Sequence, residues 1–76
     1  MKLWLVERTD PESIWDAYLG HVVQAPDEAA ARALAAEKAA DEGPRRWSDP
    51  SQVRCECIGE GPDEIPGVVL SSFMAG

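Results

Sequence analysis

Two arginines beside a tryptophan form the strongest chemical signal in the chain. Residues 44–52 read PRRWSDPSQ, so Arg45, Arg46 and Trp47 are consecutive. Guanidinium groups bind anions through paired hydrogen bonds, and an indole ring stacks on a nucleobase. The three residues therefore predict a loop that binds a ligand or a partner, with a mononucleotide or cyclic nucleotide as a chemically coherent ligand. A structural interpretation stays open, because arginines that follow a helix complement its dipole and Trp47 can close the core.

Residue types that could support catalysis are few. His21 is the single histidine and stands in an apolar segment, where a structural role is the commoner one. No serine or cysteine occupies a recognisable nucleophile motif, and neighbouring acids such as Asp41 and Glu42 carry little information on an acidic chain. We therefore expect a protein that is not an enzyme.

The two cysteines, Cys55 and Cys57, are separated by one residue. A tetrahedral metal site would need two further soft or imidazole ligands, and only His21 is available in one chain. At this spacing in a strand a disulfide would be strained. We expect reduced cysteines that pack as small apolar residues, with no metal and no cofactor.

Length and composition describe one small globular domain spanning residues 1–76, with 45% hydrophobic and 28% charged residues. Seven basic residues against fourteen acidic ones give a net charge of −7. General binding to nucleic acid or to an anionic membrane needs the opposite charge and is not expected. No stretch is long and apolar enough to span a membrane, and the first residues contain too few apolar positions for a signal peptide. We expect a cytoplasmic protein.

Alternation of apolar residues predicts strands at residues 2–8 and 14–25, joined by a turn at residues 9–13. Gly20, in the middle of the second strand, indicates a bulge or a close backbone approach. A helix is predicted over residues 27–41, which contain eight alanines and begin with Asp27 after a proline. Its inward stripe would hold Ala30, Ala33, Leu34 and either Glu37 or Ala40.

The second half of the chain predicts a loop at residues 44–52, with one helical turn capped by Ser48 or Asp49. Residues 53–58 form an alternating strand whose inward side chains are Val53, Cys55 and Cys57. A loop at residues 59–67 and a last strand at residues 68–73 complete the chain.

This order of elements, ββαββ, predicts the α+β class: a four-stranded, mainly antiparallel sheet with one helix on one face. The first and last strands are apolar on both faces, which a single helix cannot cover. We expect a second copy of the chain to provide the cover, making a dimer or larger homo-oligomer through sheet faces or edge strands. The alternative is a partner protein that docks on an exposed apolar patch containing Trp4, Tyr18, Val22 and Phe73.

The layout of nearly all 76 residues resembles a group of small bacteriophage- and prophage-encoded proteins without an assigned activity. The most recognisable pieces are W-S-x-P-x-x-V at residues 47–53 and G-V-V-L-x-S-F at residues 67–73. The resemblance implies a phage protein in the cytoplasm of a bacterial host. It supplies no catalytic or binding residue.

Compact, acidic, oligomeric proteins of this kind resemble phage inhibitors of host defence. The expected function is therefore a non-enzymatic binding protein that inhibits a host defence or regulatory factor stoichiometrically. It would do so by masking a protein or by sequestering a nucleotide signal. The alternative function is a structural or assembly accessory of the virion.

Overall fold

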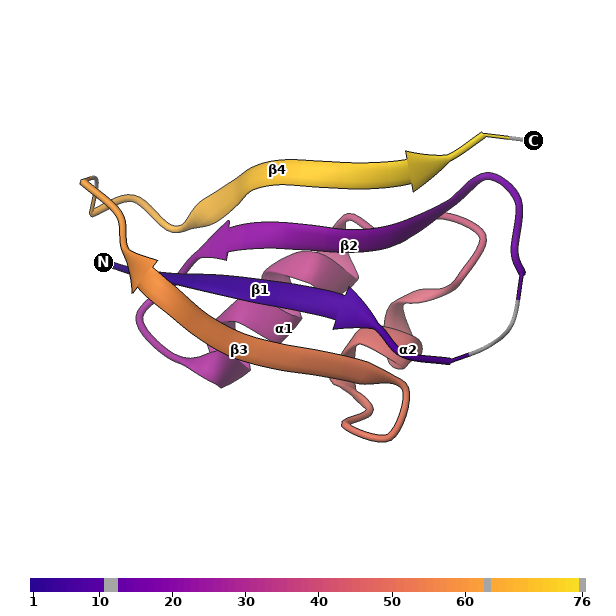
Figure 1. Cartoon of the computed structure of the whole chain (residues 1–76), viewed down its shortest axis with the longest axis horizontal. Helices are drawn as coiled ribbons and strands as arrows, with labels where there is room; N and C mark the ends of the chain where they lie inside the picture. The colour runs from indigo at the N-terminus through magenta and orange to yellow at the C-terminus, as the bar shows by residue number, and fades with distance from the viewer. Residues whose placement is uncertain (11–12, 63, 76) are drawn as a thin grey trace.

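A computed structural model describes residues 1–10, 13–62 and 64–75. Four strands, β1 (Lys2–Arg8), β2 (Ala17–Gln24), β3 (Val53–Glu60) and β4 (Gly67–Met74), form one antiparallel sheet in the order β3-β1-β2-β4. Two helices, α1 (Glu28–Glu37) and α2 (Pro44–Ser48), lie on the same face of this sheet (Figure 1). The predicted α+β fold with a four-stranded antiparallel sheet is confirmed. The prediction of a single helix is wrong, because α2 is a second one.

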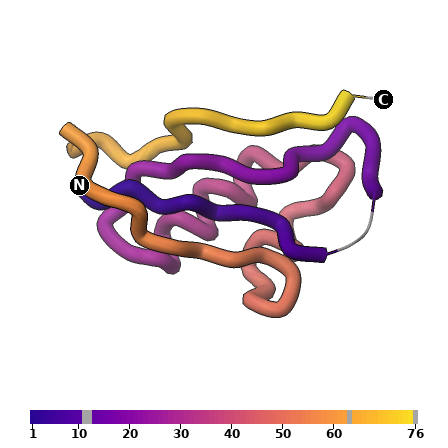
Figure 2. The backbone as a smooth tube through the Cα atoms, viewed as in Figure 1, coloured from indigo at the N-terminus to yellow at the C-terminus, as the bar shows by residue number. Residues whose placement is uncertain are grey.

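The connection from β3 to β4 crosses the molecule from one edge of the sheet to the other. Along the way the Gly61 N–H donates to the Met1 carbonyl at 2.8 Å, and the Gln24 side chain donates to the Ile65 carbonyl at 3.0 Å. The N-terminus lies at this end of the sheet and the C-terminal end of β4 lies at the other (Figure 2). This crossing covers one end of the sheet face that the helices leave open.

The core lies between the sheet and the two helices. Its fully buried members come from every layer: Val6, Val23, Ala25, Ala31, Ala35, Trp47 and Val53. Because alanines dominate the inner side of α1, the helix packs close to the strands. No helix among the described residues is long and apolar enough to cross a membrane.

The inward stripe of α1 differs from the predicted one. Ala31 and Ala35 are fully buried, Ala30 and Leu34 are half-buried, and Ala33 is exposed. Arg32 explains this rotation, since its guanidinium donates to the carbonyls of Trp47 and Val53 at 3.2 and 3.0 Å and bonds Glu28 at 3.0 Å. These contacts turn the helix so that Arg32 faces α2 and the start of β3.

Helix α1 ends at Glu37, four residues before the predicted end at residue 41. The backbone N–H groups that would extend the helix have other acceptors. The Ala40 N–H donates to the Glu42 carboxylate at 3.2 Å and the Asp41 N–H donates to the Asp16 carbonyl at 3.1 Å. Alanine propensity is a weak preference, and these tertiary hydrogen bonds override it.

Helix α2 occupies part of the predicted loop. Pro44 takes the first helical position, where its missing N–H costs nothing, and Gly43 precedes it with a φ of 83°. Asp49 ends α2, and it also caps the single turn predicted at this point, which spans residues 50–52. Its carboxylate accepts from the Ser51 N–H at 2.9 Å, and its carbonyl accepts from the N–H groups of Gln52 and Val53, both at 3.0 Å.

Strand β2 begins at Ala17, three residues later than predicted, and the bulge beside Gly20 is confirmed. Tyr18 pairs with Phe73 and Gly20 pairs with Ser72, so Leu19 is the extra residue. A Cβ on Gly20 would lie 3.2 Å from the Val6 carbonyl oxygen, which explains the glycine. The bulge also breaks the predicted alternation and brings Tyr18 to the face of His21, with ring centroids 4.8 Å apart.

Candidate interaction surface

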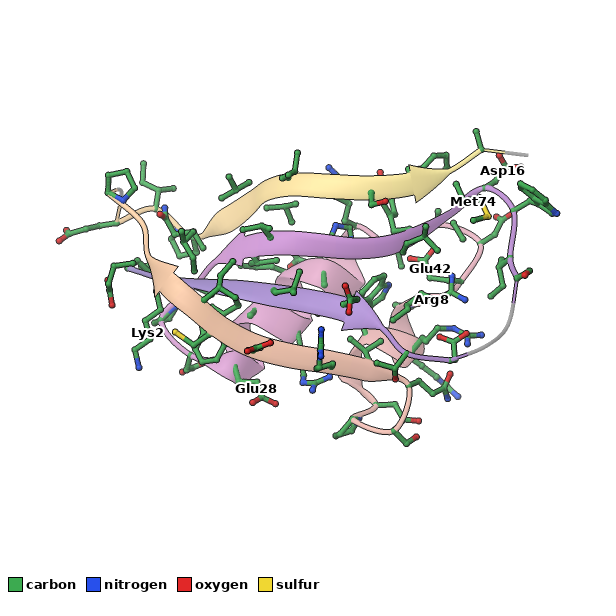
Figure 3. All side chains as sticks on the ribbon, viewed as in Figure 1. Lys2, Arg8, Asp16, Glu28, Glu42 and Met74 are labelled. Carbon is green, nitrogen blue, oxygen red and sulfur yellow. The ribbon has the colours of Figure 1, made fainter. Side chains whose placement is uncertain are left out.

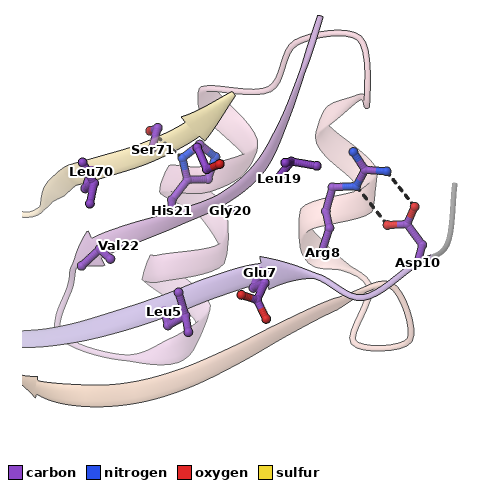
Figure 4. A pocket seen from close by; sticks show the side chains of 11 residues that line it. Leu5, Glu7, Arg8, Asp10, Leu19, Gly20, His21, Val22, Leu70 and Ser71 are labelled. Carbon is purple, nitrogen blue, oxygen red and sulfur yellow. Dashed lines mark hydrogen bonds and ion pairs between the residues drawn. The ribbon is translucent and has the colours of Figure 1, made fainter. Parts of the chain in front are cut away.

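The open sheet face, opposite the helices, carries a row of apolar side chains that crosses three strands. Leu5 of β1 pairs with Val22 of β2, and Val22 pairs with Leu70 of β4. Residues directly opposite one another in an antiparallel sheet project to the same face. Leu5 and Val22 are half-buried, whereas Leu70 is 67% exposed. Figure 4 shows this row, which we call the apolar row.

Beside the apolar row the sheet is hollowed. The next set of paired residues is Glu7, Gly20 and Ser72, and its central member has no side chain. The result is an open groove of about 630 Å³ lined by Leu5, Glu7, Arg8, Asp10, Leu19, Gly20, His21, Val22, Leu70, Ser71 and Ser72. A groove with an apolar floor and a few polar groups is suited to receive a partner's side chain.

An ion pair closes one end of the groove. Arg8 bonds Asp10 through two nitrogens at 3.0 and 2.8 Å, and the two side chains are only 3% and 9% exposed (Figure 4). Arg46 of α2 approaches the same carboxylate at 3.1 Å. The hydrogen bonds from Arg8 lower the pKa of Asp10 to about 2, assisted by the charges of Arg8 and Arg46. The pair is a fixed wall that joins the end of β1 to α2.

His21 lies behind the groove, inside the core. Its ring packs against Tyr18 and Trp47, both at a centroid distance of 4.8 Å, and it is 2% exposed. Nδ1 lies 2.8 Å from the Ser71 hydroxyl, while Nε2 has no hydrogen-bond partner among the described residues. Burial, followed by the charge of Lys38, lowers the pKa of His21, so the ring is neutral at pH 7. This environment suits a packing role for the ring.

The predicted ligand loop at Arg45, Arg46 and Trp47 requires correction. Trp47 is 0% exposed and its indole N–H donates to Glu42, so the ring cannot stack on a nucleotide. Arg46 bonds the Glu42 carbonyl at 3.2 Å, the Gln52 side chain at 2.9 Å and Asp10. Arg45 alone is exposed. Trp47 closes the core, as the structural interpretation predicted, and Arg46 attaches α2 to its neighbours.

The predicted apolar patch of Trp4, Tyr18, Val22 and Phe73 is not one surface. Trp4 and Tyr18 pack against the core on the helix side, and the Trp4 N–H donates to the Ala25 carbonyl at 3.0 Å. Phe73 packs edge-on against Tyr18 at 4.9 Å. Only Val22 belongs to the open face: the bulge at Leu19 shifts Tyr18 to the other side together with its partner Phe73, and Trp4 pairs with the core residue Val23. On the open face the apolar neighbours of Val22 are Leu5 and Leu70, not Trp4, Tyr18 and Phe73.

Glu42 is the residue whose importance the sequence did not indicate. It is 6% exposed, and its carboxylate accepts from the Tyr18 N–H at 3.0 Å, the Ala40 N–H at 3.2 Å and the Trp47 indole at 2.8 Å. It thereby joins β2, the chain after α1, and α2 beside His21. In Figure 3 Glu42 lies beside the beginning of β2, at the right of the view. Its sequence context, an acid next to another acid, is typical of a solvated turn.

Both cysteines lie in β3, where Cys55 pairs with Val6 and Cys57 pairs with Trp4. Cys55 is half-buried and packs against the core, and burial raises the pKa of its thiol. Cys57 is exposed. In the part of the chain that the structure describes, no group of three or more His, Cys, Asp or Glu residues could hold a metal ion.

Comparison with protein-family models, with curated proteins and with solved structures finds no match to this chain. The resemblance to phage-encoded proteins therefore stays a prediction. Among the surfaces of the described residues, the groove beside the apolar row combines a hollow with apolar side chains.

Proposed function

We propose that this chain is a non-enzymatic binding protein that masks a partner protein through the groove on its open sheet face. The observation that carries the proposal is the apolar row of Leu5, Val22 and Leu70 beside the hollow at Gly20. Apolar side chains gathered next to a hollow on an otherwise polar surface are characteristic of interaction sites. An apolar side chain of the partner would enter the hollow and complete the packing of the row.

The charges around the groove define the complementary partner surface. Glu7 lines the groove, and Glu56 pairs with Leu5 and is exposed on the same face. Arg54 offsets Glu7 at 2.9 Å, yet the chain as a whole carries a net charge of −7. We infer a partner that presents an apolar side chain flanked by basic groups, since the net charge of −7 attracts such a surface and Glu56 lies exposed beside the groove to receive a basic group.

Masking of a protein has better support than sequestration of a nucleotide. A nucleotide needs a cation for its phosphate and an accessible ring for its base. Trp47 is buried, and the guanidinium groups of Arg8 and Arg46 are engaged with Asp10. The groove instead offers aliphatic contacts, which suit a protein side chain.

The resemblance to phage proteins suggests the identity of the partner. We propose a host defence or regulatory factor in the bacterial cytoplasm, inhibited in a fixed stoichiometric ratio. A protein of the virion, for which this chain would be an assembly accessory, is the alternative partner. The same experiment separates the two.

A photo-reactive amino acid placed at Glu7, inside the groove, tests the proposal in the cell that produces the protein. The matched control carries it at Glu37, which is exposed at the end of α1. We expect one host protein to cross-link from position 7 and not from position 37, and Val22→Lys to reduce that product about tenfold. The purified partner should then bind in a fixed ratio by calorimetry.

Three outcomes would contradict parts of this proposal. Equal cross-linking from positions 7 and 37 would remove the groove as the site. A virion protein as the product would replace the host factor by the assembly function. Native mass spectrometry of the gently purified protein showing a retained nucleotide would restore sequestration in place of masking.

A further inference from the structure

The exposed apolar residues are concentrated around one edge strand. Of the large hydrophobic side chains that are exposed, Ile65, Val69, Leu70 and Phe73 lie in β4 or directly before it. No charged residue occurs from Ile65 to Ala75. In Figure 1 β4 forms the upper edge of the sheet, and neither helix lies behind it. Within the described residues β4 pairs with β2 alone, so its outer backbone groups face outward.

The opposite edge of the sheet is protected. Strand β3 carries Arg54, Glu56 and Glu60, and its pairing with β1 shifts register between Leu3 and Trp4. Charged side chains and bulges are the devices by which edge strands avoid pairing with another chain. The pairing of β4 with β2 shifts register near Val69 and again opposite Ser72 and Phe73, where the extra residue lies in β2. From Leu70 to Met74, however, β4 carries no charge and no proline, so the two edges differ in the charges that oppose association.

The sequence of β4 after Val69 is self-complementary for antiparallel pairing. If two copies pair about a two-fold axis at Ser72, Leu70 of each copy faces Met74 of the other and Ser71 faces Phe73. Leu70 and Met74 are four residues apart in the sequence, and Ser71 and Phe73 are two apart. Because side chains alternate along a strand, both members of each pair project to the same face of the sheet. The small Ser72 side chain occupies the axis, where the two copies approach most closely.

Charge also favours a second copy as the occupant of this edge. Each chain carries −7, so self-association requires a contact surface from which charges are absent. β4 meets this requirement, whereas β3 carries Arg54, Glu56 and Glu60, and antiparallel self-pairing of β3 about Ile58 would bring Glu56 against Glu60 of the other copy.

We propose that β4 pairs with β4 of a second copy of this chain, antiparallel and about a two-fold axis at Ser72, to form one continuous sheet. This inference goes beyond the masking function and does not depend on it. The two-fold axis is perpendicular to the sheet and keeps the open faces on the same side. The two grooves then lie on one surface, which would bind a partner bivalently.

Sedimentation equilibrium of the wild type and of two lysine variants tests the pairing. Ser72→Lys places two ammonium groups opposite one another on the axis, while Ser48→Lys adds the same charge at an exposed serine of α2. We expect a wild-type dimer, a monomeric Ser72→Lys variant with unchanged circular dichroism, and a dimeric Ser48→Lys variant. Both substitutions lower the net negative charge, so general repulsion cannot explain a difference between them.

Cross-linking provides a second measurement that needs no destabilising charge. In a chain with Cys55→Ala and Cys57→Ser, a single cysteine replaces Ser72, or Ile58 of β3 as the control. A short bis-maleimide should convert the Ser72→Cys chain to a covalent dimer and leave the Ile58→Cys chain monomeric.

A wild type that remains monomeric up to millimolar concentration would overturn the pairing, as would a dimer that survives Ser72→Lys or cross-links from position 58. The masking function fails separately. If the chain forms the β4 dimer but no partner protein cross-links from position 7, the masking function is refuted and the pairing stands. If the chain is monomeric and a partner still cross-links from position 7, the pairing is refuted and the masking function stands.

Discussion

The indole N–H of Trp47 donates a 2.8 Å hydrogen bond to the buried carboxylate of Glu42, in the middle of the packing between α2 and the sheet. Glu42 also accepts from the backbone N–H groups of Tyr18 and Ala40. One side chain therefore satisfies donors from a strand, from the chain after α1 and from α2. The site that resembled a ligand loop in sequence is held together by this carboxylate.

Glu42→Gln should lower the free energy of unfolding by about 2 to 3 kcal/mol. The amide has one oxygen and one NH₂ group, so it cannot accept at both of the positions where the carboxylate accepts. Urea unfolding measures the change. Asp41→Asn, at the exposed neighbouring position, is the control and should alter stability by less than about 0.5 kcal/mol. Equal effects of the two variants would show that the hydrogen bonds of Glu42 contribute little.

Arg46→Ala and Arg45→Ala should differ, although the two arginines are adjacent. Arg46→Ala removes bonds to Asp10, Gln52 and the Glu42 carbonyl and should cost about 1 to 3 kcal/mol of stability. Arg45 is exposed, so Arg45→Ala should change stability by less than about 0.5 kcal/mol. Thermal or urea unfolding of both variants makes the comparison. A large loss with Arg45→Ala would contradict the assignment.

Stability should fall as the pH decreases below 6.5 because of His21. Burial and the charge of Lys38 lower its pKa in the folded state, while the nearby Glu42 opposes this only in part. Below pH 6.5 the unfolded chain binds a proton that the folded chain does not, at a cost of up to about 1.4 kcal/mol per pH unit. Above that pH the contribution of His21 is constant.

His21→Phe isolates this effect, because it keeps an aromatic ring between Tyr18 and Trp47. Both chains should carry Ser71→Ala, so that the serine hydroxyl does not lose its partner in only one of them. We expect a weaker decrease in stability between about pH 7.5 and about pH 5.5 in the phenylalanine chain, measured by urea unfolding. Parallel pH profiles would assign the decrease to other groups.

A second loss of stability is expected in stronger acid, from Asp10. Its pKa is about 2 in the folded protein against 3.8 for the ordinary carboxyl. The stabilising contribution is therefore present above pH 3.8 and is lost as the pH falls through about 2. Asp10→Asn should cost about 2 to 3 kcal/mol at neutral pH, because Arg8 and Arg46 lose their shared anion. The two proteins should converge in stability at about pH 2, and a constant difference would exclude the ion pair as its cause.

The features that the sequence predicted well are those that depend on neighbouring residues. A short run that is apolar on both faces located β1 at residues 2–8, and alternation of apolar and polar residues located the inward side chains Val53 and Cys55 of β3. Pro26 and Asp27 located the start of α1, where the Asp27 carboxylate accepts the Ala30 N–H at 2.8 Å. Gly20 marked the bulge, since only a residue without Cβ fits easily against the Val6 carbonyl.

The candidate site could be predicted only in part. Val22 belongs to the groove as expected, but Trp4, Tyr18 and Phe73 do not. The extra residue in β2 shifts Tyr18, which pairs with Phe73, to the helix side, and Trp4 faces the helices because it pairs with the core residue Val23. Leu5 and Leu70 join Val22 through the strand order β3-β1-β2-β4, which places three segments distant in the chain beside one another. Pairing of this kind depends on contacts that no local pattern contains.

By itself, then, the sequence determined the positions of the strands, the beginning of the helix and the acidic, alanine-rich character of the chain, since these follow from period, capping and composition over a few residues. Only the tertiary structure decided where α1 ends, that Trp47 is buried, and that Glu42 is a core residue. Each of these depends on hydrogen bonds between groups far apart in the chain, such as the Tyr18 N–H and the Glu42 carboxylate. Their partners are brought together by the packing of the helices on the sheet, and an acid or an indole has no local signal that announces such a partner.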